Sequence, residues 1–105
     1  MSTTTYAGTT VEVDAEGFMT DPSRWDERIA AAIAAEAGVG ELTDRHWQVV
    51  NFMRERYLES GAAPSIRTLG KASGVPIKEL YELFPRGPAK LAAKIAGIPK
   101  PRGCI

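Results

Sequence analysis

The residue best suited to carry chemistry is the single cysteine, Cys104, which stands next to last in the 105-residue chain. A cysteine thiolate is a nucleophile that exchanges with disulfides and accepts sulfur from persulfides. The preceding run, Gly97-Ile-Pro-Lys-Pro-Arg-Gly103, contains two prolines, which prevent a helix and favour extended backbone. Extended at ~3.3 Å per residue, the segment from Gly97 to Cys104 spans up to about 23 Å. We therefore expect residues 98–105 to form an extended C-terminal arm that carries the thiol to another protein.

Three basic side chains lie near this cysteine in the sequence, namely Lys94, Lys100 and Arg102. Cations attract anionic partners and stabilise thiolate sulfur. We take these three residues as candidates for steering a partner and for binding anionic sulfur; each is also compatible with an ordinary surface role.

Other kinds of catalytic site have little support. His46 is the only histidine, and neither a Cys/His cluster nor an HExxH spacing accompanies it. Zinc sites need three or four such ligands, so we expect no metal, and we expect His46 to be packed or solvent-facing in the first turn of a helix. The sequence also has no GxSxG, P-loop or GxGxxG motif. Hydrolysis and nucleotide-dependent reactions are therefore not indicated, and no cofactor is expected.

Composition points to a cytoplasmic protein. A single cysteine cannot form an internal disulfide, and so gives no sign of an oxidising compartment. No stretch approaches the roughly 18 to 20 apolar residues of a membrane span. We expect no membrane association.

Charge is distributed unevenly along the chain although the net charge is zero. Residues 1–60 contain eleven acidic and five basic residues, whereas residues 61–105 contain eight basic and two acidic residues. Two interpretations stay open. The two surfaces of the folded protein could attract each other, or a basic face could meet an acidic partner or a phosphate backbone.

The N-terminal part of the chain predicts a β-hairpin. Residues 1–9, rich in Ser, Thr and Gly, are expected to be a flexible tail before a single domain over residues 10–97. Residues 10–14 alternate with period two, residues 14–17 indicate a turn, and Phe18-Met19 continues the apolar pattern. Two strands alone are marginal in water, so the hairpin must lie on a helical body.

Capping and turn residues divide the rest of the chain into five helical segments. These run from Asp21 to Gly38, Thr43 to Gly61, Ser65 to Ser73, Ile77 to Leu83 and Pro88 to Ala96. Trp25 and Trp47 are expected to be core anchors where the first two helices cross. The fold class is therefore mainly α, a compact helical bundle with a small N-terminal β-hairpin and an extended C-terminal arm.

The segments 65–73 and 77–83, separated by Gly74-Val-Pro76, also have the pattern of a helix-turn-helix. A DNA-binding protein is thus the main alternative. Only Lys78 stands out in the would-be recognition helix, and its neighbours Glu79 and Glu82 would repel phosphate. We therefore expect no direct binding of nucleic acid.

A specific family resemblance supports the cysteine hypothesis. The strings Phe84-Pro-Arg-Gly-Pro-Ala-Lys90 and Lys94-Ile-Ala-Gly-Ile-Pro-Lys-Pro-Arg-Gly-Cys-Ile105 closely resemble the C-terminal signature of the DsrC/TusE sulfur-carrier family. Segments at residues 14–18, 42–47, 50–54 and 63–67 are similar to that family in the same order, so the resemblance covers nearly everything after residue 10.

The resemblance implies a function and partners. Members of the DsrC/TusE family have an N-terminal β-hairpin on a helical bundle. Their penultimate cysteine accepts sulfur as a persulfide or forms mixed disulfides, and the resemblance implies the same role for Cys104. It implies a persulfide carrier rather than a stand-alone enzyme, working with a protein donor and acceptor. These could be a sulfurtransferase or DsrEFH/TusBCD-like complex, a sulfite reductase or a tRNA-thiolating enzyme. A third possibility is an inert assembly subunit of a sulfur-oxidising or sulfite-reducing complex.

Two departures from the family pattern matter. The resemblance implies that members working with dissimilatory sulfite reductase carry a second cysteine eleven residues before the last cysteine, where this chain has Ala93. The chain should therefore behave as a one-thiol carrier, closer to TusE. The stretch between Lys71 and Tyr81 is also about seven residues shorter than the resemblance predicts, which leaves the partner open.

Overall fold

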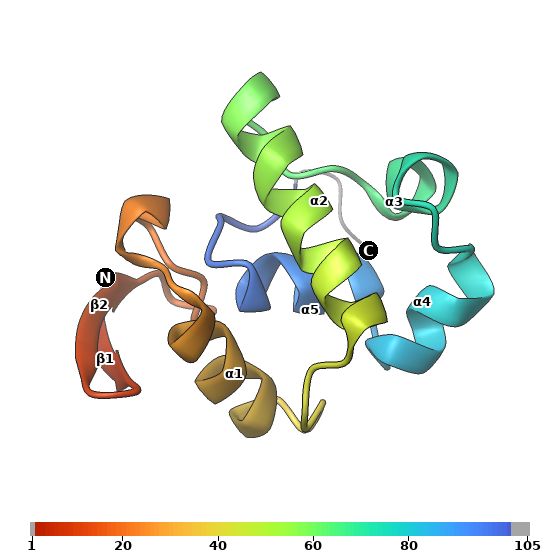
Figure 1. The fold of residues 1–105 in the computed structure, drawn as a ribbon. Coiled ribbons are helices and arrows are strands. Elements are labelled where there is room, and N and C mark those ends of the chain that lie inside the picture. The colour runs from red at the N-terminus through yellow and green to blue at the C-terminus, as the bar shows by residue number, and fades with distance from the viewer. Residues whose placement is uncertain (1, 102–105) are drawn as a thin grey trace.

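The computed structural model describes residues 2–101, which form a two-stranded hairpin beside five α-helices (Figure 1). The elements are β1 (Ser2–Tyr6), β2 (Thr9–Val13), the short 3₁₀-helix η1 (Pro22–Arg24), α1 (Glu27–Glu36), α2 (Asp44–Ser60), α3 (Ile66–Ala72), α4 (Ile77–Leu83) and α5 (Pro88–Ile95). The predicted fold class, a mostly helical fold with an N-terminal hairpin, is confirmed.

The hairpin begins earlier than expected. β1 pairs with β2 in antiparallel register, with Ser2 opposite Val13 and Tyr6 opposite Thr9. The two-residue loop consists of Ala7 and Gly8, with φ of 51° and 80°, and such left-handed loops match the twist of paired strands. Residues 2–6, which we expected to belong to a tail, are therefore a strand, because their β-branched threonines suit a sheet and Tyr6 is buried.

The predicted turn after β2 is confirmed as a tight loop. The carboxylate of Asp14 accepts hydrogen bonds from the backbone N–H groups of Glu16 (2.9 Å) and Phe18 (3.0 Å). Beyond it Met19 forms an isolated bridge with Val13. This loop, residues 14–17, holds Glu16 at the surface and buries Phe18 and Met19.

The first expected helix is two helices. Asp21 caps η1 through its side chain, and Asp26 caps α1 by accepting a hydrogen bond from the N–H of Ile29 at 2.9 Å. Between them Trp25 has extended backbone, with φ −79° and ψ 145°. Two side-chain caps in close succession favour two helix starts. Trp25 consequently lies outside α1 and is not at a crossing of two helices as predicted; its side chain packs at the end of α5.

α2 has the predicted boundaries. Thr43 and His46 form a capping box, and Gly61 ends the helix in a left-handed conformation. His46 Nδ1 accepts from the Thr43 N–H (3.0 Å), so its Nε2 carries the proton and donates to the carbonyl of Leu83 (3.0 Å). His46 is thus a packed residue that joins the start of α2 to the end of α4.

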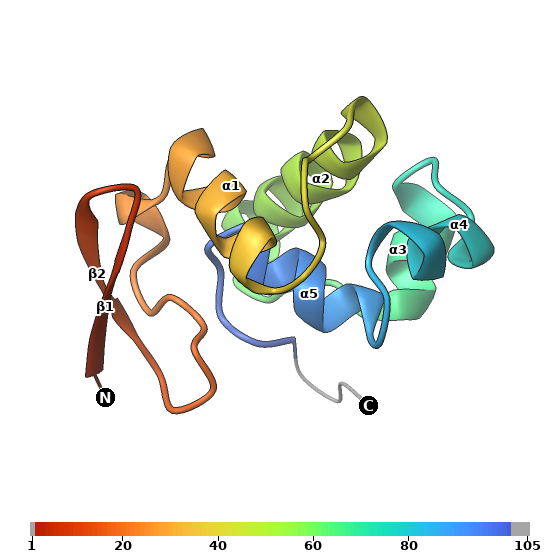
Figure 2. The ribbon, with the colours of Figure 1, turned by 90° about the horizontal axis from the view of Figure 1, so that it is seen from below.

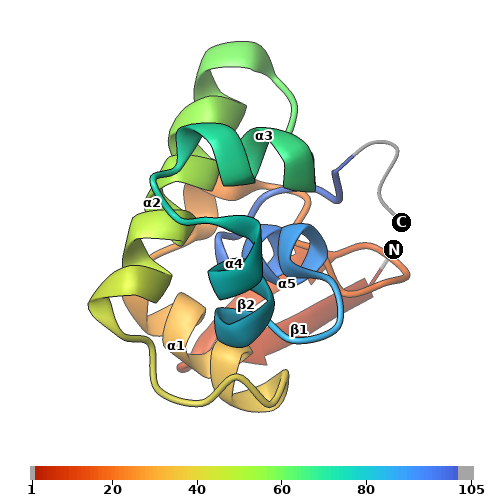
Figure 3. The ribbon, with the colours of Figure 1, turned by 90° about the vertical axis from the view of Figure 1, so that its right-hand side faces the viewer.

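α3 and α4 form the helix-turn-helix-like pair, seen nearest the viewer in Figure 3. A Cβ on Gly70 would lie 2.4 Å from Cγ1 of Ile77, so glycine permits the close approach of the two helices. The guanidinium of Arg45 on α2 binds the Glu79 carboxylate with two hydrogen bonds of 2.7 and 2.8 Å. This bidentate pair ties α4 to α2.

α5 is the central helix of the fold, because it contacts α1, α2, α3 and α4. Figure 3 shows it between α4 in front and the hairpin behind. Its buried residues are Pro88, Ala89, Ala92, Ala93 and Ile95. The small alanines allow neighbouring helices to approach closely, so the core fixes the point at which α5 ends.

Candidate functional site: the root of the C-terminal arm

The end of α5 determines how the chain continues towards Cys104. The N–H of Ile98 donates to the carbonyl of Ala93 (3.1 Å), and the N–H of Gly97 donates to that of Lys94 (3.1 Å). With Gly97 left-handed at φ 69°, this is a Schellman motif. Ile98 after it is fully buried. The helix therefore ends in a defined turn whose first residue beyond the glycine is anchored in the core.

Trp25 and Arg54 hold this turn from the outside. The indole Nε1 of Trp25 donates to the carbonyl oxygen of Ile95 at 2.8 Å. The Arg54 guanidinium donates to the carbonyls of Ala96 (2.8 Å) and Pro22 (3.3 Å) and lies 4.1 Å from the centroid of the Trp25 ring. We call Trp25 and Arg54 the α5 clamp. It satisfies two carbonyls at the end of α5 that have no partner within the helix.

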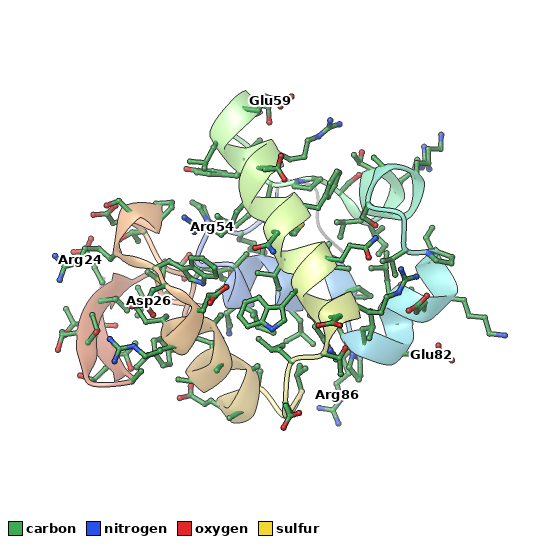
Figure 4. All side chains as sticks on the ribbon, in the orientation of Figure 1. Arg24, Asp26, Arg54, Glu59, Glu82 and Arg86 are labelled. Atoms are coloured by element: carbon green, nitrogen blue, oxygen red, sulfur yellow. The ribbon has the colours of Figure 1, made fainter. Side chains whose placement is uncertain are left out.

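Arg54 is partly buried in this position. Figure 4 shows it on the side of α2 that faces η1 and α1. Burial lowers the pKa of the Arg54 guanidinium from its usual value, because desolvation disfavours the charged form. Its two carbonyl acceptors and the face of the indole ring offset that cost. The sequence marked residues 50–54 only as part of the family resemblance and gave Arg54 no role at this site.

The arm does not leave the body at residue 98 as expected. Pro101 is buried, and Lys100 is half-buried with its ammonium 3.0 and 3.1 Å from the two carboxylate oxygens of Glu16. Figure 2 shows the segment after α5 running back along the helix on the side that faces the hairpin. Residues 98–101 therefore pack on the protein, because an apolar side chain and an ion pair attach them to it. Residues 102–105 lie outside the described residues.

The structure brings two of the four candidate site residues to one place. Lys100 pairs with Glu16, and the ammonium of Lys94 lies 5.3 Å from the centroid of the Phe18 ring. Both lysines thus reach the loop that follows β2. Cys104 and Arg102 are outside the described residues, so their roles stay predictions. Ala93, where the family resemblance predicts a second cysteine in some members, is fully buried in α5.

Nothing in the described part of the chain groups the ligands of a metal ion. Within residues 2–101 no three His, Asp or Glu side chains come together in that way. None of the helices there is long and apolar enough to cross a membrane.

Comparison with known proteins decides the family. The family model described as DsrC like protein matches residues 5–105. The chain belongs to the DsrC-like family. Its match extends to the last residue and so includes the segment with Cys104.

Individual relatives and solved structures match almost the full length of this chain. Sulfurtransferase TusE of Salmonella paratyphi A is 47% identical over 107 residues, covering 95% of this chain and 97% of the relative. The crystal structure of dissimilatory sulfite reductase I (DsrI) matches with a TM-score of 0.88 and 38% identity, covering 99% of this chain and all of that one. The NMR structure of Allochromatium vinosum DsrC matches with a TM-score of 0.82 and 40% identity, covering 99% and 98%.

An alignment longer than this chain agrees with the shortening expected from the sequence. The TusE alignment is 107 positions long and this chain has 105 residues, so the relative contains residues that this chain lacks. That the missing residues fall between Lys71 and Tyr81 stays a prediction. The high TM-scores are consistent with a change confined to a small part of the fold.

Proposed function

We propose that this DsrC-like protein carries sulfur as a persulfide on Cys104 and passes it between two partner proteins. The observation that carries the proposal is the family match through residue 105, which covers the penultimate position of the only thiol in the chain. The relative called sulfurtransferase TusE supports the same reaction class. Because Cys104 is the only thiol and Ala93 replaces the second cysteine, the transfer is intermolecular in both directions.

The proposed transfer is a thiolate exchange. The Cys104 thiolate attacks the terminal sulfur of a donor persulfide, a new S–S bond forms at Cys104, and the donor's S–S bond breaks. The donor leaves as a thiolate, and the Cys104 persulfide keeps the terminal sulfur and its proton. No net oxidation occurs, so the step needs no redox cofactor. An acceptor thiolate then takes the sulfur in the same manner and releases the Cys104 thiolate.

The α5 clamp and the Lys100–Glu16 pair contribute positioning. They attach the chain as far as Pro101 to the body, and the covalent chain allows at most about 11 Å between the Cα atoms of Pro101 and Cys104. A fixed root reduces the conformations that must be lost when a partner takes up the thiol. Lys94 and Arg102 are the cations proposed to attract a partner protein. The main role of Lys100 is to anchor the arm to Glu16.

The partners and the location follow from the same proposal. A protein donor of the sulfurtransferase or DsrEFH/TusBCD-like kind loads Cys104, and a sulfite reductase or a tRNA-thiolating enzyme receives the sulfur. One similar solved structure is that of dissimilatory sulfite reductase I (DsrI), and one relative is called sulfurtransferase TusE. A free thiol of this kind functions in the reducing environment of the cytoplasm.

The surface of α4 weighs against the helix-turn-helix alternative. Its exposed residues include Ile77 (44% exposed) and Tyr81 (53% exposed), and Glu82 is exposed beside Lys78. A phosphate backbone requires a surplus of positive charge, which this face lacks. A DNA gel shift that persists at moderate salt and disappears in Lys78→Glu would favour DNA binding over the sulfur-carrier function.

The experiment that tests the carrier function is intact-protein mass spectrometry after incubation with a persulfide-loaded sulfurtransferase. We expect a gain of one sulfur, about 32 Da, that is reversed by a reducing agent and absent in Cys104→Ala. The variant also serves as the control for non-specific sulfur. An unchanged mass of the wild type, under conditions that load an established acceptor, would contradict the proposal.

A further inference from the structure

A positively charged groove lies between α5 and the loop after β2. Its lining consists of Glu16, Phe18, Arg86, Lys90, Leu91 and Lys94, and its volume is about 200 Å³. We call it the α5 groove. Lys90 and Lys94 are spaced by four residues and occupy one face of α5, and Arg86, which precedes the helix with φ 69°, also lines the groove. Figure 4 shows Arg86 on the outer edge of the molecule, far from Arg54.

The three cations of this groove form no ion pair within residues 2–101. The carboxylate that lines it, Glu16, is already paired with Lys100 at 3.0 Å. No ion pair within 4.0 Å is formed there by Arg86, Lys90 or Lys94 with a described residue. Three like charges in one groove repel one another and attract an anionic group. The groove therefore carries a local surplus of positive charge in a chain whose net charge is zero.

The volume and the lining residues of the α5 groove restrict the class of ligand that it can bind. About 200 Å³ is less than the ~300 to 1,000 Å³ of a typical small-molecule pocket, so the groove is too small for a cofactor. The apolar side chains of Phe18 and Leu91 lie beside the cations. Carboxylate side chains of a protein segment fit both features. The basic residues of α3 and α4, namely Arg67, Lys71 and Lys78, do not line it, so the groove does not continue over those helices as a long phosphate-binding strip.

We propose that the α5 groove docks an acidic, carboxylate-bearing segment of the protein that exchanges sulfur with Cys104. The inference rests on the proposed function and adds the chemistry of the partner. Lys100 fixes the root of the arm on Glu16, which is itself part of the groove lining. A partner seated in the groove is therefore close to the point from which the last residues extend. Docking there raises the local concentration of the donor or acceptor thiol around Cys104.

Binding of a defined acidic probe tests the groove directly. The probe is a fluorescein-labelled hexaglutamate peptide, with hexaglutamine as the uncharged control, measured by fluorescence anisotropy with the full-length protein. We expect Lys90→Glu to weaken hexaglutamate binding about tenfold and Lys78→Glu, an identical charge change on α4, to weaken it less than about twofold. Equal losses in the two variants would overturn the inference. Tighter binding of a single-stranded oligoribonucleotide than of hexaglutamate at about 0.15 M salt would overturn it too.

Rates of sulfur transfer distinguish the docking site in the α5 groove from the carrier function of Cys104. Loading of Cys104 is timed with two donors, glutathione persulfide and a persulfide-loaded TusBCD-like complex. We expect the ratio of the protein-donor rate to the small-donor rate to fall about tenfold in Lys90→Glu and to be unchanged in Lys78→Glu. An unchanged ratio in Lys90→Glu, with Cys104 loaded normally, would overturn the docking site and leave the carrier function standing. Failure of both donors to load the wild-type protein would overturn both.

Discussion

The indole Nε1 of Trp25 donates a hydrogen bond to the main-chain carbonyl of Ile95 over 2.8 Å, between residues 70 positions apart in the sequence. This contact joins the segment before α1 to the last turn of α5. Arg54, stacked on the same indole, reaches the next carbonyl, that of Ala96. Two segments of the chain, α2 and the segment before α1, thereby hold the turn at the end of α5, and this arrangement leads to the first three predictions.

Trp25→Phe should destabilise the protein by about 1 to 2 kcal/mol, because it leaves the Ile95 carbonyl without its donor while keeping an aromatic ring. Urea unfolding followed by circular dichroism measures the change. The matched control is Trp47→Phe, since Trp47 is also partly buried but its indole makes no hydrogen bond to another described residue. Equal destabilisation in the two variants would show that the hydrogen bond adds nothing to the loss of ring size.

Arg54→Lys should loosen the start of the arm with a smaller effect on the rest of the fold. Lysine keeps the charge but cannot form the fork that reaches the carbonyls of both Ala96 and Pro22. We expect the amide protons of Gly97 and Ile98 to exchange with solvent roughly tenfold faster, as measured by hydrogen-exchange NMR. Arg56→Lys on the same helix is the control, because the Arg56 guanidinium lies over the Phe52 ring and binds no carbonyl of a described residue. Unchanged exchange at both amides in Arg54→Lys would argue against the clamp.

Gly97→Ala should cost more stability than a positive φ alone explains. A Cβ at residue 97 would lie 2.3 Å from Cδ1 of Trp25, so the clamp must open to admit it. Gly38→Ala isolates the conformational part, since Gly38 has φ 83° and open space around its Cβ position. We expect about 1 kcal/mol of destabilisation for Gly38→Ala and at least about 3 kcal/mol for Gly97→Ala. Similar midpoints of thermal unfolding for the two variants would contradict the close contact with Trp25.

The Arg45–Glu79 pair predicts one component of the pH dependence of stability. Hydrogen bonds from the Arg45 guanidinium lower the pKa of the Glu79 carboxyl below its usual value of 4.5. The pair therefore stabilises the folded state fully above the unfolded-state pKa, and this stabilisation is lost as the pH falls through the lowered, folded-state pKa. Glu79→Gln should be less stable than the wild type at neutral pH, and the difference should shrink below about pH 4.5.

Thermal unfolding at a series of pH values measures this difference. Glu82→Gln on the same helix is the control, because Glu82 forms no ion pair with another described residue. A gap between Glu79→Gln and the wild type that stays constant down to strongly acidic pH would show that Arg45 and Glu79 do not interact in solution.

Local patterns were sufficient for most of the element boundaries. Thr43 and Ser65 accept hydrogen bonds from N–H groups three residues later, and Gly61 ends α2 with a bond to the carbonyl of Tyr57. Such caps connect residues that are near neighbours in the sequence, and so the residue types alone reveal them. The first strand was missed because its loop, Ala7-Gly8, lacks the Asn-Gly or Asp-Gly pair that usually marks a two-residue turn.

The sequence by itself determined the family, the lone thiol at Cys104 and the fold class, since these depend on residue identity and short-range spacing. Only the tertiary structure decided how the end of α5 and residues 98–101 are attached to the rest of the protein. Trp25 and Ile95 are 70 residues apart, Arg54 and Ala96 are 42 apart, and Glu16 and Lys100 are 84 apart. No periodicity links such pairs, because their contact depends on how the helices pack around α5. The same packing assembles the α5 groove from a loop after β2 and one face of the last helix.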